Sequence, residues 1–420
     1  MAKGQVQAIA QKLVTYADLL QGQAQKLHSE VLYRIQSFAT TRHDVLRSVE
    51  CLRAVADARQ YLQRKTRRVV VFLPLNRPVY FLVLWAIIPS LVAEKVHVRA
   101  SQKTQPILRA LVSYLQLEEF FPNIYAESGT WHDFTNELVT RADVTIFTGS
   151  DSEERRAHAA RKKGSLFLCR GWGCNPIVVG PGADVEDAIR KIVPAKTFDS
   201  GQDDNGPDCI LVHDSIAPRF LNDLEDEIDR IKVGNYSDQD VVVGPILDTT
   251  GLPRLASFLQ QHSKDIANGG TIDFAKSIVH PTIIHACLSD STNYERLSAP
   301  IFFVNTYDSD AELAKYFDDP RYRGNEMFIS LFGASEYVNE TESTILKEQN
   351  VLDLDSDDDG NSEYVGGASF VAKFGEPVRT PVHILEVISK HLQAAERASA
   401  RRRRDSCASL ESRSGLTEHE

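Results

Sequence analysis

The chain has 420 residues, of which 42% are hydrophobic and 25% charged, so it is long enough for two or three globular domains with self-sufficient cores. Its formal net charge of −11 excludes a general nucleic-acid binder. The six cysteines form no CxxC pair and no signal-peptide pattern opens the chain, which together favour a reduced, cytoplasmic protein.

The first part of the chain is predicted to be helical and to lead into a buried apolar segment. Apolar residues recur at steps of three and four over residues 4–64, which is the period of an amphipathic helix. The longest apolar run, Val79–Ala93, is shorter than the roughly 20 residues that a membrane-spanning helix needs, and Pro89 interrupts it. We therefore predict a buried core helix here and no membrane partner.

Short β runs then alternate with amphipathic segments along the chain. The expected strands cover residues 69–73, 96–98, 144–147, 166–168 and 177–179, and the helices cover 107–115, 153–163 and 185–193. A second unit begins near residue 174, with strands at 209–213 and 300–305 and helices at 220–231 and 252–262. Strands that alternate with helices predict an α/β fold with a largely parallel, doubly wound sheet.

Two segments near the end stand apart from this pattern. The first is the acidic loop Asp353–Gly360, in which Asp355, Asp357, Asp359 and Gly360 fit the first half of a calcium-binding loop. Gly366 stands where the bidentate glutamate is expected, so a solvated acidic loop is favoured. The tail from about Ala395 has too few bulky apolar residues to offset its ordering entropy, which predicts disorder. Within it, Arg401–Arg404 followed by Ser406 fits either a basic-directed kinase site or a solvated charge run.

Several motifs follow one another along the chain. They are PLNRP (74–78), PSLVAEKVHVRAS (89–101), IFTGS (146–150), GWGCNPIVV (171–179), SGQDDNGPDCILVHDSI (200–216), VGNYSDQDVVVGPILD (233–248) and LSAPIFFV (297–304). In this order they resemble the motifs of the aldehyde dehydrogenase superfamily, over roughly residues 5–390. Each motif alone is weak, and the shared order carries the resemblance.

This resemblance implies the fold and its division into domains. The N-terminal helices and a Rossmann-type nucleotide-binding domain are expected over residues 1–172, and an α/β catalytic domain over residues 173–380. A C-terminal helix over residues 381–394 and a disordered tail over residues 395–420 complete the division. The family inserts an oligomerisation hairpin before its Pro-Trp-Asn strand, whereas here only Lys65–Arg68 separate the helical region from the first strand. The hairpin is therefore expected to be missing, which leaves the oligomeric state open.

The resemblance also implies NAD or NADP as the cofactor, in a weakened site. Arg99 stands in place of the family's cofactor-side lysine and keeps its charge but not its geometry. Gly149 and Ser150 of the Phe-Thr-Gly-Ser turn precede a helix, where backbone NH groups can hold a phosphate oxygen, and a plain strand–helix turn is the alternative. Arg296 falls where the family has its ribose-contacting glutamate, with Glu295 beside it.

Two further catalytic positions of the family map onto this chain. Asn76 falls on the oxyanion-hole asparagine, whose side-chain NH group stabilises developing negative charge. It can also simply shape the turn between Pro74 and Pro78, and both interpretations can hold together. Arg170 falls on the general-base glutamate, and arginine remains protonated near neutral pH.

The nucleophile position carries the largest departure from the family. Its Gly-Gln-x-Cys motif maps onto residues 201–204, which places Asp204 on the cysteine, with the spacing to Val212 of the next strand intact. This is therefore a substitution within an unshifted frame. Cys209 would need altered spacing on both sides, and in the apolar run CILVH a buried thiol acting as a small hydrophobe is favoured.

Two functions follow from this pattern. The first is an NAD(P)-dependent, aldehyde-dehydrogenase-like oxidoreductase for a small aldehyde or related molecule, with its activity reduced or lost because of Asp204. The second is a pseudoenzyme that acts as a binding or scaffolding protein without turnover. The histidines form no metal-ligand cluster, so no metal is expected.

Overall fold

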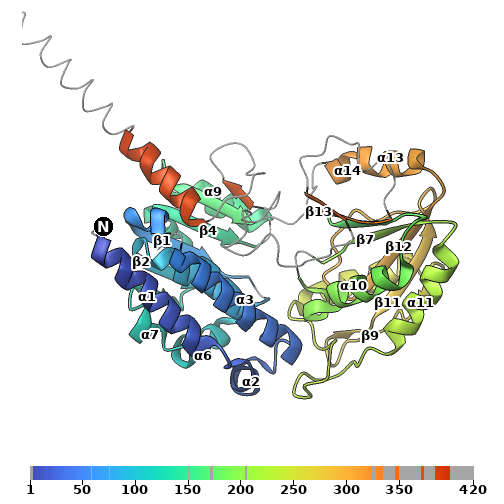
Figure 1. The fold of residues 1–420 in the computed structure, drawn as a ribbon, viewed down its shortest axis with the longest axis horizontal. Helices are drawn as coiled ribbons and strands as arrows, with labels where there is room; N and C mark the ends of the chain where they lie inside the picture. Colours follow the sequence, from blue (N-terminus) through green and yellow to red (C-terminus); the bar gives the residue numbers. More distant parts are fainter. Residues whose placement is uncertain are drawn as a thin grey trace, which may run out of the picture.

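The chain forms two lobes, each built around its own β-sheet (Figure 1). The computed structural model describes residues 3–57, 59–74, 76–149, 151–170, 174–203, 206–323, 328–333, 346–349, 370–372 and 384–397. Outside these ranges lie Ser150, Asp204, the acidic loop Asp353–Gly360 and the tail beyond residue 397. The calcium and kinase hypotheses concern residues in this part of the chain, so they fall outside the described residues.

The first lobe contains a six-stranded sheet with the order β15-β5-β4-β1-β2-β3. Its strands are β1 (Thr66–Phe72), β2 (Ala93–Arg99), β3 (Ile124–Ala126), β4 (Val144–Thr148), β5 (Leu166–Arg170) and β15 (Phe370–Ala372). All neighbours are parallel except β15 and β5. The predicted parallel sheet is confirmed. It could be predicted from the sequence because parallel strands that are buried on both faces have continuous apolar sequences.

Helices cover both faces of this sheet. They are α1 (Lys3–Leu20), α2 (Ala24–Leu27), α3 (Phe38–Asp57), α4 (Pro78–Leu82), α5 (Ile88–Ser90), α6 (Gln105–Tyr114), α7 (Leu117–Phe120), α8 (Trp131–Glu137) and α9 (Asp151–Ala160), with helical turns at His28–Leu32, Arg59–Gln63, Val83–Ile87 and Val139–Arg141. The core that contains α1, α3, α4 and α5 lies on one face, and a smaller core with α8 and α9 lies on the other. Every residue from Pro78 to Ser90 is buried, which confirms the predicted core helix.

The second lobe contains a seven-stranded sheet with the order β14-β13-β6-β7-β12-β11-β8. Its strands are β6 (Pro176–Val179), β7 (Cys209–His213), β8 (Ile266–Asn268), β11 (Thr282–Cys287), β12 (Ile301–Tyr307), β13 (Phe328–Phe332) and β14 (Leu346–Gln349), and β9 (Ile272–Asp273) and β10 (Ile278–Val279) form a separate hairpin. Only β8 runs antiparallel to its neighbour in this sheet.

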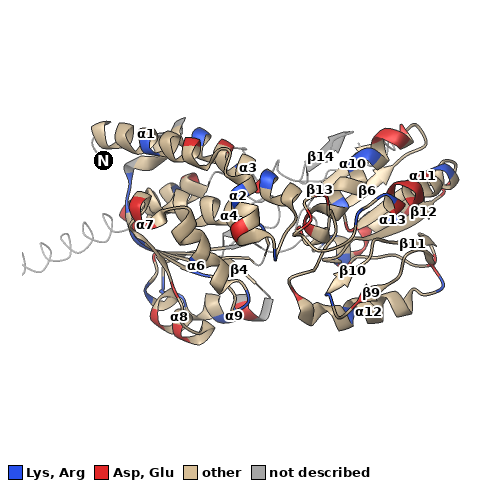
Figure 2. Ribbon diagram, turned by 90° about the horizontal axis from the view of Figure 1, so that it is seen from below, with Lys and Arg blue, Asp and Glu red and all other residues tan. Residues whose placement is uncertain are grey.

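Helices also cover both faces of the second sheet. They are α10 (Val185–Thr197), α11 (Ala217–Asp229), α12 (Leu252–Gln261), α13 (Asp310–Asp318) and α14 (Pro320–Arg323), with turns at Phe198–Gly201 and Thr249–Gly251. The core of α10 and α11 is separate from the core of α12 and α13. In the view of Figure 2, basic and acidic residues are interspersed over both lobes.

The C-terminal part of the chain returns to the first lobe. The strand β15 pairs with β5, so the chain is back in the first sheet before residue 380, the predicted end of the second domain. A helix over residues 384–397 follows, and Ile384, Leu385 and Ile388 pack into the core of the first lobe. The helical turn that ends at Gln63 is followed almost directly by β1, in agreement with the expected lack of a hairpin. Among the described residues, no helix is both long and apolar enough to cross a membrane.

Candidate functional site

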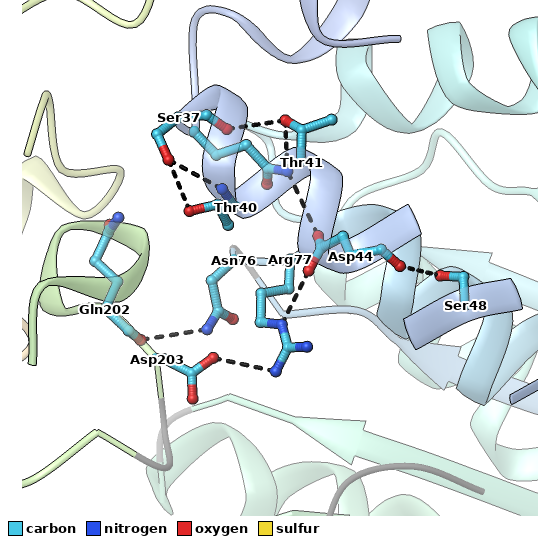
Figure 3. Close-up of polar contacts among 10 residues, drawn as sticks. Ser37, Thr40, Thr41, Asp44, Ser48, Asn76, Arg77, Gln202 and Asp203 are labelled. Atoms are coloured by element: carbon cyan, nitrogen blue, oxygen red, sulfur yellow. Dashed lines mark hydrogen bonds and ion pairs between the residues drawn. The ribbon is translucent and has the colours of Figure 1, made fainter. Parts of the chain in front are cut away.

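Two motif segments that are far apart in the sequence meet where the lobes join (Figure 3). Asn76 follows β1 in the first lobe, is only 7% exposed, and donates from Nδ2 to the backbone oxygen of Gln202 at 3.2 Å. Arg296 donates from Nη2 to the same oxygen at 2.8 Å. The structure therefore brings Asn76 against the loop that precedes the nucleophile position, with its amide engaged in holding that loop.

Arg77, the next residue, is fully buried at this junction. Its Nε lies 3.0 Å from Oδ1 of Asp44 on α3, and its Nη1 lies 3.3 Å from Oδ2 of Asp203 (Figure 3). All three side chains are almost completely buried, at 0%, 0% and 2% exposure. A guanidinium in such a place needs carboxylate partners because its desolvation is costly. The pairs tie α3, the β1–α4 turn and the loop of the second lobe together.

Further contacts hold this buried charge in place. The rings of Tyr80 and Phe198 lie 4.5 and 5.4 Å from the guanidinium carbon of Arg77, so the cation is flanked by aromatic faces. Gln36 donates to Oδ2 of Asp44 at 3.5 Å. Burial raises the pKa of Asp44 to about 6, and the charge of Arg77 opposes that rise.

The loop before the nucleophile position has an unusual backbone. Asp199, Ser200 and Gly201 are all left-handed, with φ values of 47°, 56° and 77°. A Cβ atom on Gly201 would lie 2.3 Å from the carbonyl carbon of Ala299, so only glycine fits there. The Ser200 hydroxyl lies 2.5 Å from the Tyr236 hydroxyl, which anchors the strained turn. The glycine of the Gly-Gln motif is thus a steric requirement of the loop.

Gln202 anchors the same loop through its side chain. Its Oε1 accepts a hydrogen bond from the backbone of Leu247 at 2.7 Å, and its Nε2 donates to the backbone oxygen of Asp199 at 2.8 Å. Both ends of the amide are therefore satisfied within the protein. The side chain of Gln202 therefore fixes the position of this loop on both sides.

The cysteines nearest in sequence to this loop are buried. Asp204 itself lies outside the described residues, which resume at Gly206. Cys209 on β7 is completely buried, its Sγ donates to Oδ1 of Asn305 at 3.4 Å, and burial raises the pKa of its thiol. Burial also raises the pKa of Cys174, to about 12. Neither thiol forms a thiolate readily near neutral pH, so the interpretation of Cys209 as a small hydrophobe agrees with the structure.

Arg170, at the predicted general-base position, is placed through its backbone. It is the last residue of β5, where it pairs with Thr148 of β4 on one side and Phe370 of β15 on the other. The position therefore lies at the carboxyl edge of the first sheet, which is the edge where polar groups of parallel sheets usually gather.

Several buried charged residues around this loop were not predicted from the sequence. They include Asp44, Arg77, Lys196, Asp203 and Asp208. Lys196 donates to the backbone oxygen of Leu297 at 3.1 Å, and burial lowers its pKa to about 8 while the charge of Asp208 opposes this. The sequence signal for such a residue is a charge next to an apolar run. Arg77, for example, stands directly before PVYFLVLWAII.

The predicted cofactor residues lie at neighbouring strand ends of the first sheet. Arg99 ends β2 and Gly149 directly follows β4, and both strands flank β1. Thr148 donates from Oγ1 to the backbone oxygen of Phe72 at 2.7 Å, which joins the ends of β4 and β1. Arg99 and Gly149 are therefore brought to the same edge of the sheet, whereas Ser150 lies outside the described residues.

A carboxylate of the protein lies close to the Gly149 turn. The point where a Cβ atom on Gly149 would stand lies 2.9 Å from the Phe147 ring and 3.2 Å from Oε2 of Glu153 on α9. Burial lowers the pKa of Arg99, and the nearby charge of Glu153 raises it. With Glu153 in this position the residues present do not fit a phosphate at the Gly149 turn. Across the described ranges, no three His, Cys, Asp or Glu side chains are grouped so that they could hold a metal ion.

Sequence comparisons identify similar proteins. A family model described as the aldehyde dehydrogenase family matches residues 1–330. The 4,4'-diaponeurosporen-aldehyde dehydrogenase of Staphylococcus aureus is 24% identical over 340 residues, which cover 79% of this chain and 72% of that protein. The betaine aldehyde dehydrogenase of Bacillus subtilis is 26% identical over 252 residues, which cover 57% of this chain and 51% of that protein. The chain thus spans about half the length of this second relative.

Solved structures share the architecture. A glyceraldehyde-3-phosphate dehydrogenase of Methanocaldococcus jannaschii, solved with NADP, has a TM-score of 0.68 at 16% identity, covering 82% of this chain and 81% of that chain. A succinate-semialdehyde dehydrogenase of Burkholderia pseudomallei has a TM-score of 0.71 at 16% identity, covering 82% of this chain and 78% of that chain. At these identities the likeness bears on the fold alone.

Proposed function

This chain belongs to the aldehyde dehydrogenase family, and from that premise we propose that its thiolate-based oxidation of aldehydes is reduced or lost. The observation that carries the proposal is Asp204 at the nucleophile position, with the surrounding spacing intact. The inherited substrate class is a small aldehyde, and the inherited cofactor class is NAD or NADP. A cytoplasmic location is proposed from the cysteine pattern alone.

The chemistry of the missing thiol supports this proposal. Aldehyde oxidation of this type begins when a thiolate attacks the aldehyde carbon and forms a covalent adduct. A carboxylate such as Asp204 is a poor nucleophile toward a free carbonyl. The buried thiols of Cys174 and Cys209, with their raised pKa values, offer no ready replacement. Arg170 is protonated near neutral pH and therefore cannot accept the proton of a water molecule as a general base.

The contacts of the adjacent loop support the second candidate, a non-catalytic binding or scaffolding protein. Asp203, next to the nucleophile position, is engaged in a buried ion pair with Arg77. One N–H group of the Asn76 amide, the donor type that an oxyanion hole uses, is bonded to the Gln202 carbonyl. These groups serve as a structural joint between the lobes. Selection for a stable joint without turnover would account for both features.

Two assays on the wild type, Asp204→Cys and Asp204→Ser test the loss of thiolate chemistry. Aldehyde-dependent formation of NADH or NADPH over an aldehyde panel should be absent in the wild type. Release of nitrophenol from an activated ester needs a thiolate but no cofactor, so a burst is expected only in Asp204→Cys. Asp204→Ser, of similar size but without a thiol, is the control. Turnover of aldehyde by the wild type would contradict the proposal and make Cys209→Ala the next variant.

A further inference from the structure

The carboxyl edge of the first sheet contains a topological switch point. The strand order β4-β1-β2 means that the chain winds outward in both directions from β1. In parallel α/β sheets, ligands bind outside the carboxyl ends of the strands at such a switch point. The ends of all three strands lie in register here, with Phe72 opposite Arg99 and Val71 opposite Ile146.

The groups at this edge at first suit an anion. Arg99 provides a partly buried guanidinium at the end of β2. Gly149 lies two residues before the start of α9, and the NH groups at the start of a helix attract negative charge. A phosphate would be expected to lie between these two elements.

The helix instead supplies its own negative charge. Glu153 falls within the first turn of α9. Oε2 of Glu153 reaches back over the Gly149 turn, 3.2 Å from the point that a Cβ atom there would occupy, and its charge acts on Arg99. The negative charge of Glu153 therefore acts both on the guanidinium of Arg99 and on the start of α9.

We propose that Glu153 is an internal anion that takes the place of a phosphate beside the Gly149 turn and so excludes NAD and NADP. A phosphate and a carboxylate at the same turn repel each other, and that repulsion is strong because the site is partly shielded from water. The dinucleotide can enter only when Glu153 moves away from Arg99 and Gly149. Glu153 is thus a specificity-determining residue that lowers the affinity of this edge for anionic ligands.

Binding of NADH and NADPH to the full chain, followed by their fluorescence, tests this role. The wild type should bind both weakly, and Glu153→Gln should bind them at least about tenfold more tightly because it removes the repulsive charge while keeping the size. Glu137→Gln, an exposed residue on the neighbouring α8, changes the net charge equally and should match the wild type. Adding Arg99→Ala to Glu153→Gln should remove the gain, since Arg99 would then be the phosphate partner.

Two outcomes would overturn the proposal. One is tight binding of either dinucleotide by the wild type, and the other is equal affinity of Glu153→Gln and the wild type when both unfold at similar denaturant concentrations. The readout is an equilibrium affinity and needs no thiol, so it is independent of Asp204. A failure here is therefore distinguishable from a failure of the proposed loss of catalysis.

Discussion

Arg77 is a buried ion-pair centre directly beside Asn76, the candidate oxyanion-hole residue. Its guanidinium is completely buried and is balanced by Asp44 and Asp203, which come from different lobes. A lysine is not equivalent here, because its compact ammonium group lacks the planar fork that reaches both carboxylates while lying over the rings of Tyr80 and Phe198. The residue beside the candidate oxyanion donor is thus a structural ion-pair centre.

Arg77→Ala should destabilise the protein strongly, because it leaves two buried carboxylates without their cation. Removing one partner of a buried pair typically costs about 3–5 kcal/mol of the free energy of unfolding. Urea unfolding followed by tryptophan fluorescence measures this. Arg53→Ala is the control, because Arg53 on the same helix as Asp44 pairs with Asp18 at 2.9 Å on the surface, where about 1 kcal/mol or less is expected. Equal losses in both variants would show that the buried pairs contribute little.

At the scale of single elements, the loop after α10 is fixed by its backbone. The left-handed residues Asp199, Ser200 and Gly201 turn the chain sharply, and the peptide of Ala299 passes directly against Gly201. Non-glycine residues pay an energetic penalty in this conformation, and here it is offset by the hydrogen bonds of Ser200 and Gln202. The loop is therefore rigid before any ligand is considered.

Gly201→Ala should be much more destabilising than Gly164→Ala. Both glycines have positive φ, 77° and 81°, so each substitution carries about 1–2 kcal/mol of backbone strain. A Cβ atom at Gly164 meets nothing within 4 Å, whereas at Gly201 it meets the Ala299 backbone at 2.3 Å. Overpacking of this kind adds roughly 1–3 kcal/mol. Urea midpoints that agree between the two variants would mean that the Ala299 segment moves aside freely.

The elements differ in how far they could be predicted from the sequence. The apolar runs that became β1 and β7 were readable because strands buried on both faces have no polar alternation. The short strand β15 carried no such signal, and its pairing depends on the chain returning to the first lobe. Likewise, motif order placed Asn76 near the Gly-Gln loop, but nothing local in the sequence identified Asp44 and Asp203 as the partners of Arg77. Such partners are set by tertiary packing.

At the scale of the whole molecule, the first lobe is assembled from both ends of the chain. The helix over residues 384–397 packs beside the N-terminal elements, and the hydroxyl of Tyr61 donates to Oε2 of Glu386 at 3.0 Å (Figure 1). The second lobe is thus inserted between two parts of the first. Because the helix over residues 384–397 contributes to the core of the first lobe, that core is complete only after this helix has been synthesised and has packed.

Leu385→Ala should therefore destabilise the first lobe although it lies far along the chain. Leu385 is completely buried in the core formed by the N-terminal helices, and truncation of a buried leucine costs about 2–5 kcal/mol. Trp85, buried in the same core, reports the unfolding of this lobe by its fluorescence in urea. Leu46→Ala is the control, since Leu46 is 54% exposed on α3 and should change stability by less than about 0.5 kcal/mol. If both variants unfold at the wild-type urea concentration, the helix is only docked on the lobe, and the N-terminal elements are stable without it.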